Sequence, residues 1–211
     1  MSDLPEKLFA IFEGPTKVPE DERYYASLGR FIVAYAAGEG AIHELARKLS
    51  GLKDEKARAL FGGMRIGEVI TKTRALLAHS TKSPAVRQDI EACLKQFDVV
   101  GLQRDKMVHR TTSFLGDKFS ISNESTAKSL LQVEKDLFSI EDLMCLQLDC
   151  LTILLRLMPY TNPLLRRISS AVFRGALHGP WQYKRARPAA PKKPSRKSRR
   201  LQALQRKSSQ A

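Results

Sequence analysis

Apolar residues recur every seven positions early in the chain, and this spacing constrains the fold more than any other feature. The recurring set is Leu28, Tyr35, Ile42 and Leu49. A seven-residue interval returns side chains to the same face of an α-helix, so the set forms an apolar stripe that other elements must bury. Gly51 follows as a plausible C-terminal stop. A long amphipathic helix is therefore predicted from about residue 21 to residue 50.

Two further segments show the same helical period. One covers residues 54–80 and is interrupted at Gly62 and Gly63. The other begins at Pro84, whose missing N–H is not needed in the first turn of a helix. The third predicted helix then ends in the polar sequence QRDKMVHR, residues 103–110.

The pattern changes after residue 109. The stretch TSFLGDKFSIS has Gly116 and Asp117 between short apolar runs, which predicts a two-stranded ribbon or a loop. A last core helix is predicted to open at Ser139, an N-cap residue with Asp142 three positions later, and to close at Pro159. These segments predict an all-α fold, an antiparallel four- to five-helix bundle with a short β-ribbon or loop between the third and last core helices.

Composition divides the chain into four parts. Residues 1–20 contain three prolines and are predicted to be an irregular lead-in, and residues 21–162 form the helical bundle. Residues 163–180 are predicted to add an amphipathic helix, with apolar residues on one side and arginines on the other. Residues 181–211 are dominated by Pro, Lys, Arg, Ser and Ala and are predicted to be a disordered basic tail, because they cannot bury enough apolar surface to fold alone.

The positive charge is concentrated at the C-terminal end. The formal net charge is +14, and the last of the 22 acidic residues is Asp149. Fourteen Lys and Arg residues follow Asn162, so they carry the whole excess. A segment of this kind binds polyanions such as RNA with a steep salt dependence, and aromatic residues beside it can stack on bases. The predicted nucleic-acid contacts are Trp181, Tyr183, Lys184, Arg185, Arg187, Lys192, Lys193, Arg196, Lys197, Arg199 and Arg200.

Two other interpretations of the basic end stay open. It can be a solvated end that aids solubility, or residues 164–178 and the tail can lie on an anionic membrane surface, which is the less favoured alternative. The chain has no uninterrupted apolar run of the ~18 residues that a spanning helix needs, and its acidic, polar start is unlike a secretory signal. The three cysteines have no metal-like spacing. These features predict a cytoplasmic protein without a metal or a cofactor.

The end of the third predicted helix collects ionisable residues. Arg104 continues the apolar face marked by Phe97 and Met107. An unpaired guanidinium on such a face would cost several kcal/mol, so it must find partners. Asp105 and His109 are four positions apart, close enough to touch on a helix surface.

The helix order and the spacing of Arg104, Asp105 and His109 resemble the HEPN superfamily, whose motif is an arginine, a polar residue, three to five further residues and a histidine. Glu39, in the middle of the first predicted helix, resembles an acidic residue that some relatives place near the motif arginine. The resemblance spans roughly residues 22–158 and leaves the tail unexplained. Relatives with nuclease activity often carry asparagine directly after the arginine, where this chain has Asp105.

The resemblance implies metal-independent endoribonuclease activity at a site formed where two bundles meet. RNA and a second copy of the chain are then the expected partners, and an antitoxin-like protein partner is left open. In that scheme His109 is the acid and base, Arg104 stabilises the charge that develops on the phosphate, and Asp105 orients His109. The alternative is a non-catalytic interaction protein, in which Glu39 pairs with Arg104 in a structural network and the tail docks on nucleic acid or anionic membrane.

Overall fold

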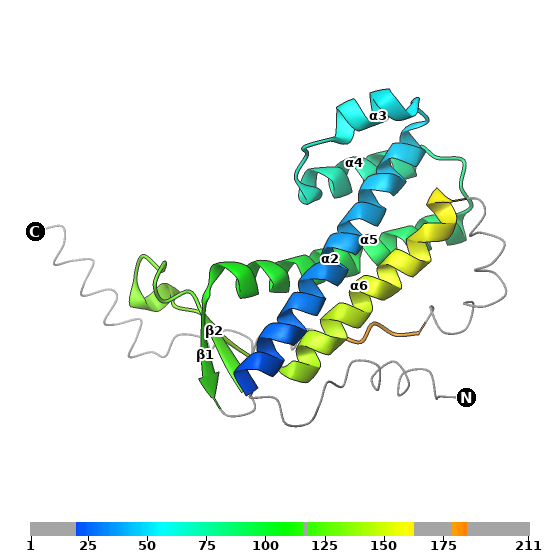
Figure 1. Ribbon diagram of the computed structural model, residues 1–211. Coiled ribbons are helices and arrows are strands. Elements are labelled where there is room, and N and C mark those ends of the chain that lie inside the picture. Colours follow the sequence, from blue (N-terminus) through cyan, green and yellow to red (C-terminus); the bar gives the residue numbers. More distant parts are fainter. Residues whose placement is uncertain (1–19, 116–117, 163–178, 185–211) are drawn as a thin grey trace, which may run out of the picture.

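The computed structural model describes residues 20–115, 118–162 and 179–184, which form a mainly helical fold with one small sheet (Figure 1). The helices are α2 (Glu20–Ser50), α3 (Asp54–Phe61), α4 (Ile66–Ala78), α5 (Pro84–His109) and α6 (Ile140–Thr161). The strands are β1 (Thr111–Leu115), β2 (Lys118–Ser122) and β3 (Lys135–Ser139), and a short 3-10 helix, η1 (Leu130–Gln132), precedes β3. The prediction of a helical fold with a short β element is confirmed. The predicted lead-in up to residue 19, most of the additional helix (residues 163–178) and the tail from residue 185 lie outside the described residues.

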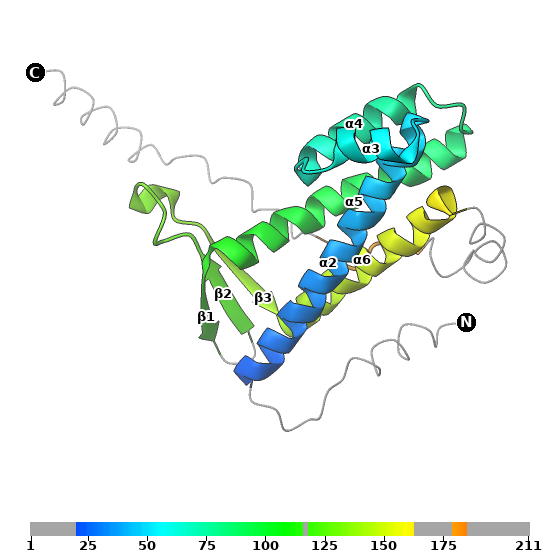
Figure 2. The same ribbon diagram turned by 45° about the horizontal axis from the view of Figure 1, so that its top comes forward.

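The three long helices alternate in direction. α2 begins beside the sheet and runs away from it, α5 returns to the sheet, and α6 runs away again (Figure 2). The short helices α3 and α4 lie at the far end. Consecutive long helices therefore run in opposite directions, and α2 and α6, which make the most extensive helix contact, run in the same direction because two reversals of the chain separate them.

The helix ends follow the local sequence. α2 ends before Gly51, whose φ of 66° lies in the left-handed region that glycine adopts without strain. The predicted break between α3 and α4 contains Gly63, with a φ of 74°. α6 opens with a capping box, because the Ser139 hydroxyl accepts from the Asp142 N–H and the Asp142 carboxylate accepts from the Ser139 N–H. Pro159 lies in the last turn of α6 instead of ending the helix.

The hydrophobic core lies where α2, α5 and α6 meet. The predicted seam of α6 is fully buried and consists of Leu143, Leu146, Cys150, Ile153 and Leu157. Phe97 of α5 stacks on Tyr35 of α2, with 4.7 Å between the ring centroids. By length and composition α6 could cross a membrane, but this is weak evidence, because the core helix of a soluble protein passes the same test.

The sheet packs on the N-terminal end of α2. Its strands are antiparallel in the order β1-β2-β3, with Phe114 opposite Phe119 and Phe119 opposite Phe138. Tyr24 of α2 packs on this aromatic row, 4.5 Å from Phe119 between ring centroids. The first two strands correspond to the predicted ribbon, whereas β3 was not expected, because its five residues directly precede the predicted helix. The third strand matters for the site because it lies beside the end of α5.

Candidate functional site at the end of α5

α5 keeps one face against the bundle as far as its last turn. Val100, Gln103 and Met107 are the buried residues there. Arg104 lies on the flank of this seam, with 32% of its side chain exposed, whereas the sequence predicted it on the seam itself. The buried face steps from Val100 to Gln103 and then to Met107, so Gln103 and not Arg104 occupies the buried position between them. The Arg104 guanidinium therefore keeps access to solvent.

Arg104 lies against α2. Its guanidinium carbon is 5.5 Å from the centroid of the Tyr35 ring, within cation–π range. Its Nη1 donates to Asp105 Oδ1 at 3.0 Å, while its Nε is buried without a hydrogen-bond partner among the described residues. Burial raises the pKa of Tyr35, and the charges of Glu39 and Asp105 raise it further. The motif arginine and both acidic candidates thus gather around one aromatic ring.

The carboxylates do not take their expected partners. Across the described ranges, no hydrogen bond or ion pair joins Glu39 to Arg104, and Asp105 is the carboxylate that Arg104 contacts. Because the Asp105 carboxylate is directed to Arg104, it makes no hydrogen bond to His109. The expected pairing of Glu39 with Arg104 and the expected orientation of His109 by Asp105 are both absent from this arrangement.

His109 is the last residue of α5 and is exposed. It follows Arg104 by five positions, and a helix turns about 100° per residue, so the two side chains leave the helix about 140° apart. Within the part of the chain that the structure describes, no hydrogen bond or ion pair involves His109. Arg104 and His109 of one copy therefore leave α5 on different sides of the helix.

The two other cations of the segment, Lys106 and Arg110, hold the end of α5 to β3 and to the residue directly before it. Lys106 Nζ is 2.7 Å from Asp136 Oδ2, and Arg110 Nη2 is 2.9 Å from Glu134 Oε2. Arg110 Nη1 also lies 3.5 Å from Asp136 Oδ2. The Lys106 and Arg110 side chains are only 11% and 19% exposed, so these pairs are shielded on the cation side. No sequence pattern predicted this contact, because it depends on the unexpected third strand.

The aromatic residues assigned to the tail belong to the folded part of the chain. Trp181 and Tyr183 pack against the hydrophobic core, and the Arg156 guanidinium lies 4.8 Å from the Trp181 ring centroid. Both residues thus have contacts within the fold, and their role in stacking on bases stays a prediction. Lys184 is exposed. The other predicted contacts, which lie outside the described residues, are Arg185, Arg187, Lys192, Lys193, Arg196, Lys197, Arg199 and Arg200.

The described residues contain no group of three or more His, Cys, Asp or Glu side chains that could hold a metal ion. The three cysteines are free thiols. Burial raises the pKa of Cys93 and of Cys150 to about 12 each, so both stay protonated at neutral pH. They serve as small core residues.

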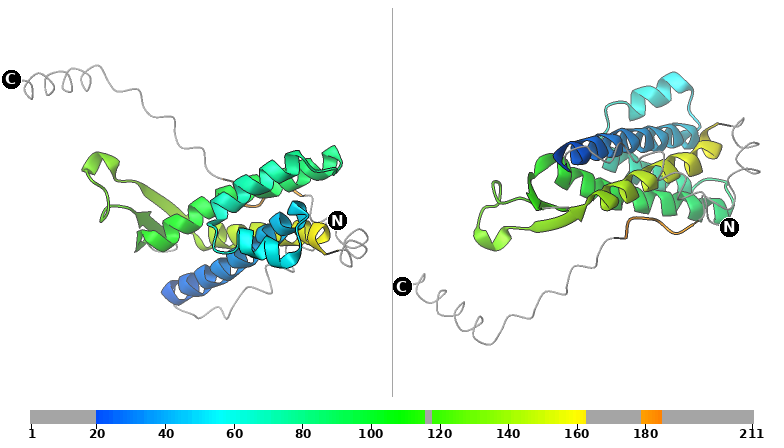
Figure 3. Two further views of the ribbon diagram at one scale, coloured as in Figure 1. Left: turned by 90° about the horizontal axis from the view of Figure 1, so that it is seen from above. Right: turned by 60° about the horizontal axis from the view of Figure 1, so that its bottom comes forward.

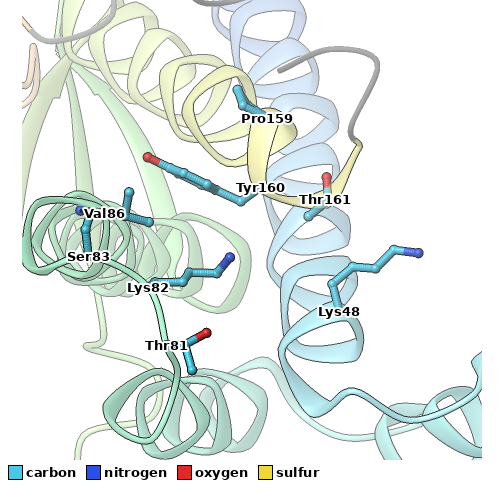
Figure 4. Close-up of a pocket in the computed structure, with 8 residues that line it drawn as sticks. All are labelled: Lys48, Thr81, Lys82, Ser83, Val86, Pro159, Tyr160 and Thr161. Atoms are coloured by element: carbon cyan, nitrogen blue, oxygen red, sulfur yellow. Dashed lines mark hydrogen bonds between the residues drawn. The ribbon is translucent and has the colours of Figure 1, made fainter. Parts of the chain in front are cut away.

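A hollow of about 480 Å³ lies at the other end of α5 (Figure 4). Its lining residues are Lys48, Thr81, Lys82, Ser83, Val86, Pro159, Tyr160 and Thr161. Lys82 extends from the connection before α5 toward Tyr160, with its Nζ 6.0 Å from the ring centroid. A helix rises about 1.5 Å per residue, so roughly 40 Å of α5 separates this hollow from His109. None of the residues predicted from the sequence lines it.

Comparisons with protein-family models, with curated proteins and with solved structures found no match.

Proposed function

We propose that this chain is an HEPN-like, metal-independent endoribonuclease whose cleavage site is completed by a second copy of the chain. The observation that carries the proposal is the distribution of partners along residues 104–110. Arg104, Asp105, Lys106 and Arg110 each have an ion-pair partner, whereas His109 is exposed and has none among the described residues. A general acid or base must reach its substrate. Among residues 104–110, His109 is the one ionisable side chain that is exposed and has no ion-pair partner among the described residues.

The chemistry assigned to the pair follows from their surroundings. His109 accepts the proton of a ribose 2′-hydroxyl or donates one to the leaving oxygen. Arg104 offers its guanidinium to the phosphate, whose paired oxygens suit its donors. The Asp105 side chain is 63% exposed, and exposed ion pairs contribute only about 0–1 kcal/mol, so phosphate can replace Asp105 at little cost. Tyr35 then keeps the guanidinium in place through its ring.

A homodimer is part of the proposal because of the helix geometry. With about 140° between Arg104 and His109, an arginine from one copy and a histidine from the other can face one phosphate, whereas the pair of one copy cannot. RNA is the proposed substrate, and the basic residues after residue 184 supply non-specific affinity for it. We also propose a cytoplasmic location, as expected from the sequence.

The decisive experiment is cleavage of single-stranded RNA in the presence of EDTA. The wild-type chain should cleave, and His109→Ala should abolish cleavage without a change in Tm, because His109 is exposed and makes no hydrogen bond or ion pair among the described residues. His79→Ala is the matched control, since His79 is also an exposed histidine at the end of a helix. A His109→Ala chain as active as the His79→Ala chain would refute the assignment.

The contribution of the tail is measured separately. Deleting residues 185–211 should flatten the dependence of RNA affinity on salt concentration, because 10 of the Lys and Arg residues are removed. Fluorescence anisotropy of a labelled RNA across a salt series gives the slope. An unchanged slope would remove the tail from RNA binding.

A second candidate is a non-catalytic interaction protein, and the ion pairs of Lys106 and Arg110 with β3 favour it. These contacts support a structural use for the charges around the motif, in place of the predicted pair between Glu39 and Arg104. In this case the tail docks on nucleic acid or anionic membrane and no RNA is cut. Absence of cleavage by the wild-type chain, with tail-dependent RNA binding retained, would favour this candidate.

A further inference from the structure

Asp149 is a buried carboxylate that pairs with no cation among the residues that the structure describes. It lies on the inward side of α6 with 1% of its surface exposed. Its hydrogen-bond partners are the Gln96 amide of α5, at 2.7 Å, and two backbone N–H groups, those of Gln182 at 2.8 Å and Tyr183 at 3.1 Å. An ionised carboxylate in such a place is tolerated only when its oxygens are hydrogen-bonded. Two of these three donors come from one segment near the C-terminus.

That segment, residues 179–184, is called here the docked segment. It lies next to α6, as Figure 3 shows in orange. Consecutive N–H groups of its backbone meet one carboxylate, and Gln96 Nε2 also lies 3.3 Å from the Tyr183 carbonyl oxygen. The contact therefore holds the backbone of the docked segment through two of its donors and one of its acceptors.

Two side chains of the docked segment, Trp181 and Tyr183, have partners in the helical part of the fold. Trp181 lies under the Arg156 guanidinium, which Asp89 of α5 holds through ion-pair contacts with Arg156 Nε and Nη2. The Tyr160 hydroxyl donates to the other oxygen of Asp89 at 3.0 Å. Arg156 is thus fixed before it meets the indole ring, as a preorganised recognition residue would be. Trp181 and Tyr183 are both half-buried against the core.

Nothing in the packing of the helices calls for a carboxylate at position 149. Its neighbours Leu146, Cys150 and Ile153 are buried apolar residues, and an apolar residue would avoid the desolvation that raises the pKa of Asp149. The carboxylate is useful only for what it binds. Within the described residues, that is the Gln96 amide and the backbone of the docked segment.

We propose that the surface formed by Gln96 of α5 with Asp149 and Arg156 of α6 is a binding site for a short peptide with two aromatic residues one position apart, and that its occupant is the chain's own docked segment. Asp149 and Gln96 bind the peptide backbone, and Arg156 binds the first aromatic ring. The basic tail then leaves the folded part of the chain at a fixed point, directly after Lys184. This site is independent of the Arg104 and His109 chemistry.

The test uses Trp181, which is the one tryptophan of the chain, so its fluorescence reports docking without a label. In the full-length wild-type chain, Trp181 should emit at a shorter wavelength than the tryptophan of a free peptide of residues 179–186. Acrylamide should also quench its fluorescence less than that of the free peptide. Asp149→Ala should move both properties to the values of the free peptide and should speed trypsin cleavage after Lys184. Asp98→Ala is the control, because Asp98 is a half-exposed carboxylate of α5 that pairs with Arg74 on the surface.

A second measurement decides the matter if Asp149→Ala alters the circular dichroism spectrum. A fluorescein-labelled peptide of residues 179–186 should bind the full-length Trp181→Ala chain more tightly than it binds wild type, because the docked segment of that variant is held less tightly. Circular dichroism should show native helix content in both chains. Equal binding to the two chains, or a Trp181 signal in wild type equal to that of the free peptide, would overturn the proposal. A wild-type dimer that Asp149→Ala converts to a monomer would overturn the assignment of the occupant to the same chain.

Discussion

Gly38 and Gly40 are two positions apart in α2, and alanine should have opposite effects on stability at the two sites. A Cβ at position 38 would lie 2.9 Å from Phe97 Cε2 and 3.6 Å from the Cys150 carbonyl oxygen. The Phe97 ring cannot yield freely, because it is 1% exposed and stacks on Tyr35. Overpacking costs about 1–3 kcal/mol and the helix propensity of alanine returns about 1 kcal/mol, so Gly38→Ala should lower the free energy of unfolding by about 0–2 kcal/mol.

Gly40 provides the matched control in the same helix. A Cβ there meets no atom within 4 Å, and the residue is exposed. Gly40→Ala should therefore gain helix propensity without a clash and raise the free energy of unfolding by about 0.5–1 kcal/mol. For a chain of this size each kcal/mol moves Tm by about 2–4 °C, so thermal and urea unfolding followed by far-UV circular dichroism will separate the two variants.

The contact itself is tested by the double variant. In the Phe97→Leu background the ring is gone, and Gly38→Ala should become neutral or stabilising, which gives a coupling energy of about 1–2 kcal/mol. If Gly38→Ala and Gly40→Ala raise stability equally in the wild-type background, the close approach of α2 to Phe97 is refuted.

Two further predictions concern carboxylates. Asp136→Asn should lower the free energy of unfolding by about 1–2 kcal/mol, because it weakens the pairs with both Lys106 and Arg110, whereas Asp98→Asn, at an exposed pair, should cost under about 0.5 kcal/mol by urea unfolding. Burial holds the pKa of Asp149 above its ordinary 3.8, so the folded state binds its proton more tightly than the unfolded state does. The free energy of unfolding of wild type, relative to that of Asp149→Asn, should therefore fall as pH rises from about 4 through the raised pKa. It should not change further at pH values above that pKa. A relative stability that rises with pH across that window would show that the carboxylate is not desolvated.

The helices could be predicted closely because their information is local. The apolar spacing of α2, the Ser139 capping box and the break at Gly63 each depend on residues within a few turns of one another. The buried seam of α6 followed from the same periodicity, and every residue assigned to it is buried. One error at the end of α5, where Gln103 and not Arg104 is on the seam, shows the limit of such spacing, since both fit a helical period.

The contacts of the charged residues could not be predicted, because they join elements far apart in the sequence. Lys106 meets Asp136 across 30 positions, and Gln96 meets Asp149 across 53. Each pairing needs a tertiary arrangement that periodicity does not specify. Asp149 itself carried a usable indication, because an acidic residue within an apolar seam predicts a buried polar partner. That partner was the backbone of a segment assigned to the tail.

Tyr35 connects the packing of the core with the candidate site, and this connection decides how variants of the site should be interpreted. Its ring stacks on Phe97, and Phe97 has room there only because position 38 carries no Cβ. The Arg104 guanidinium lies 5.5 Å from the centroid of the same Tyr35 ring. A change at Arg104 therefore removes a cation–π contact of about 0.5–1 kcal/mol as well as any phosphate ligand, so lost RNA cleavage alone would not identify its role. His109 is exposed and has no hydrogen bond or ion pair among the described residues, which is why its substitution gives the cleaner test. Activity that survives at Arg104→Lys but not at His109→Ala would assign the acid–base step to His109 and leave Arg104 a role that charge alone fulfils.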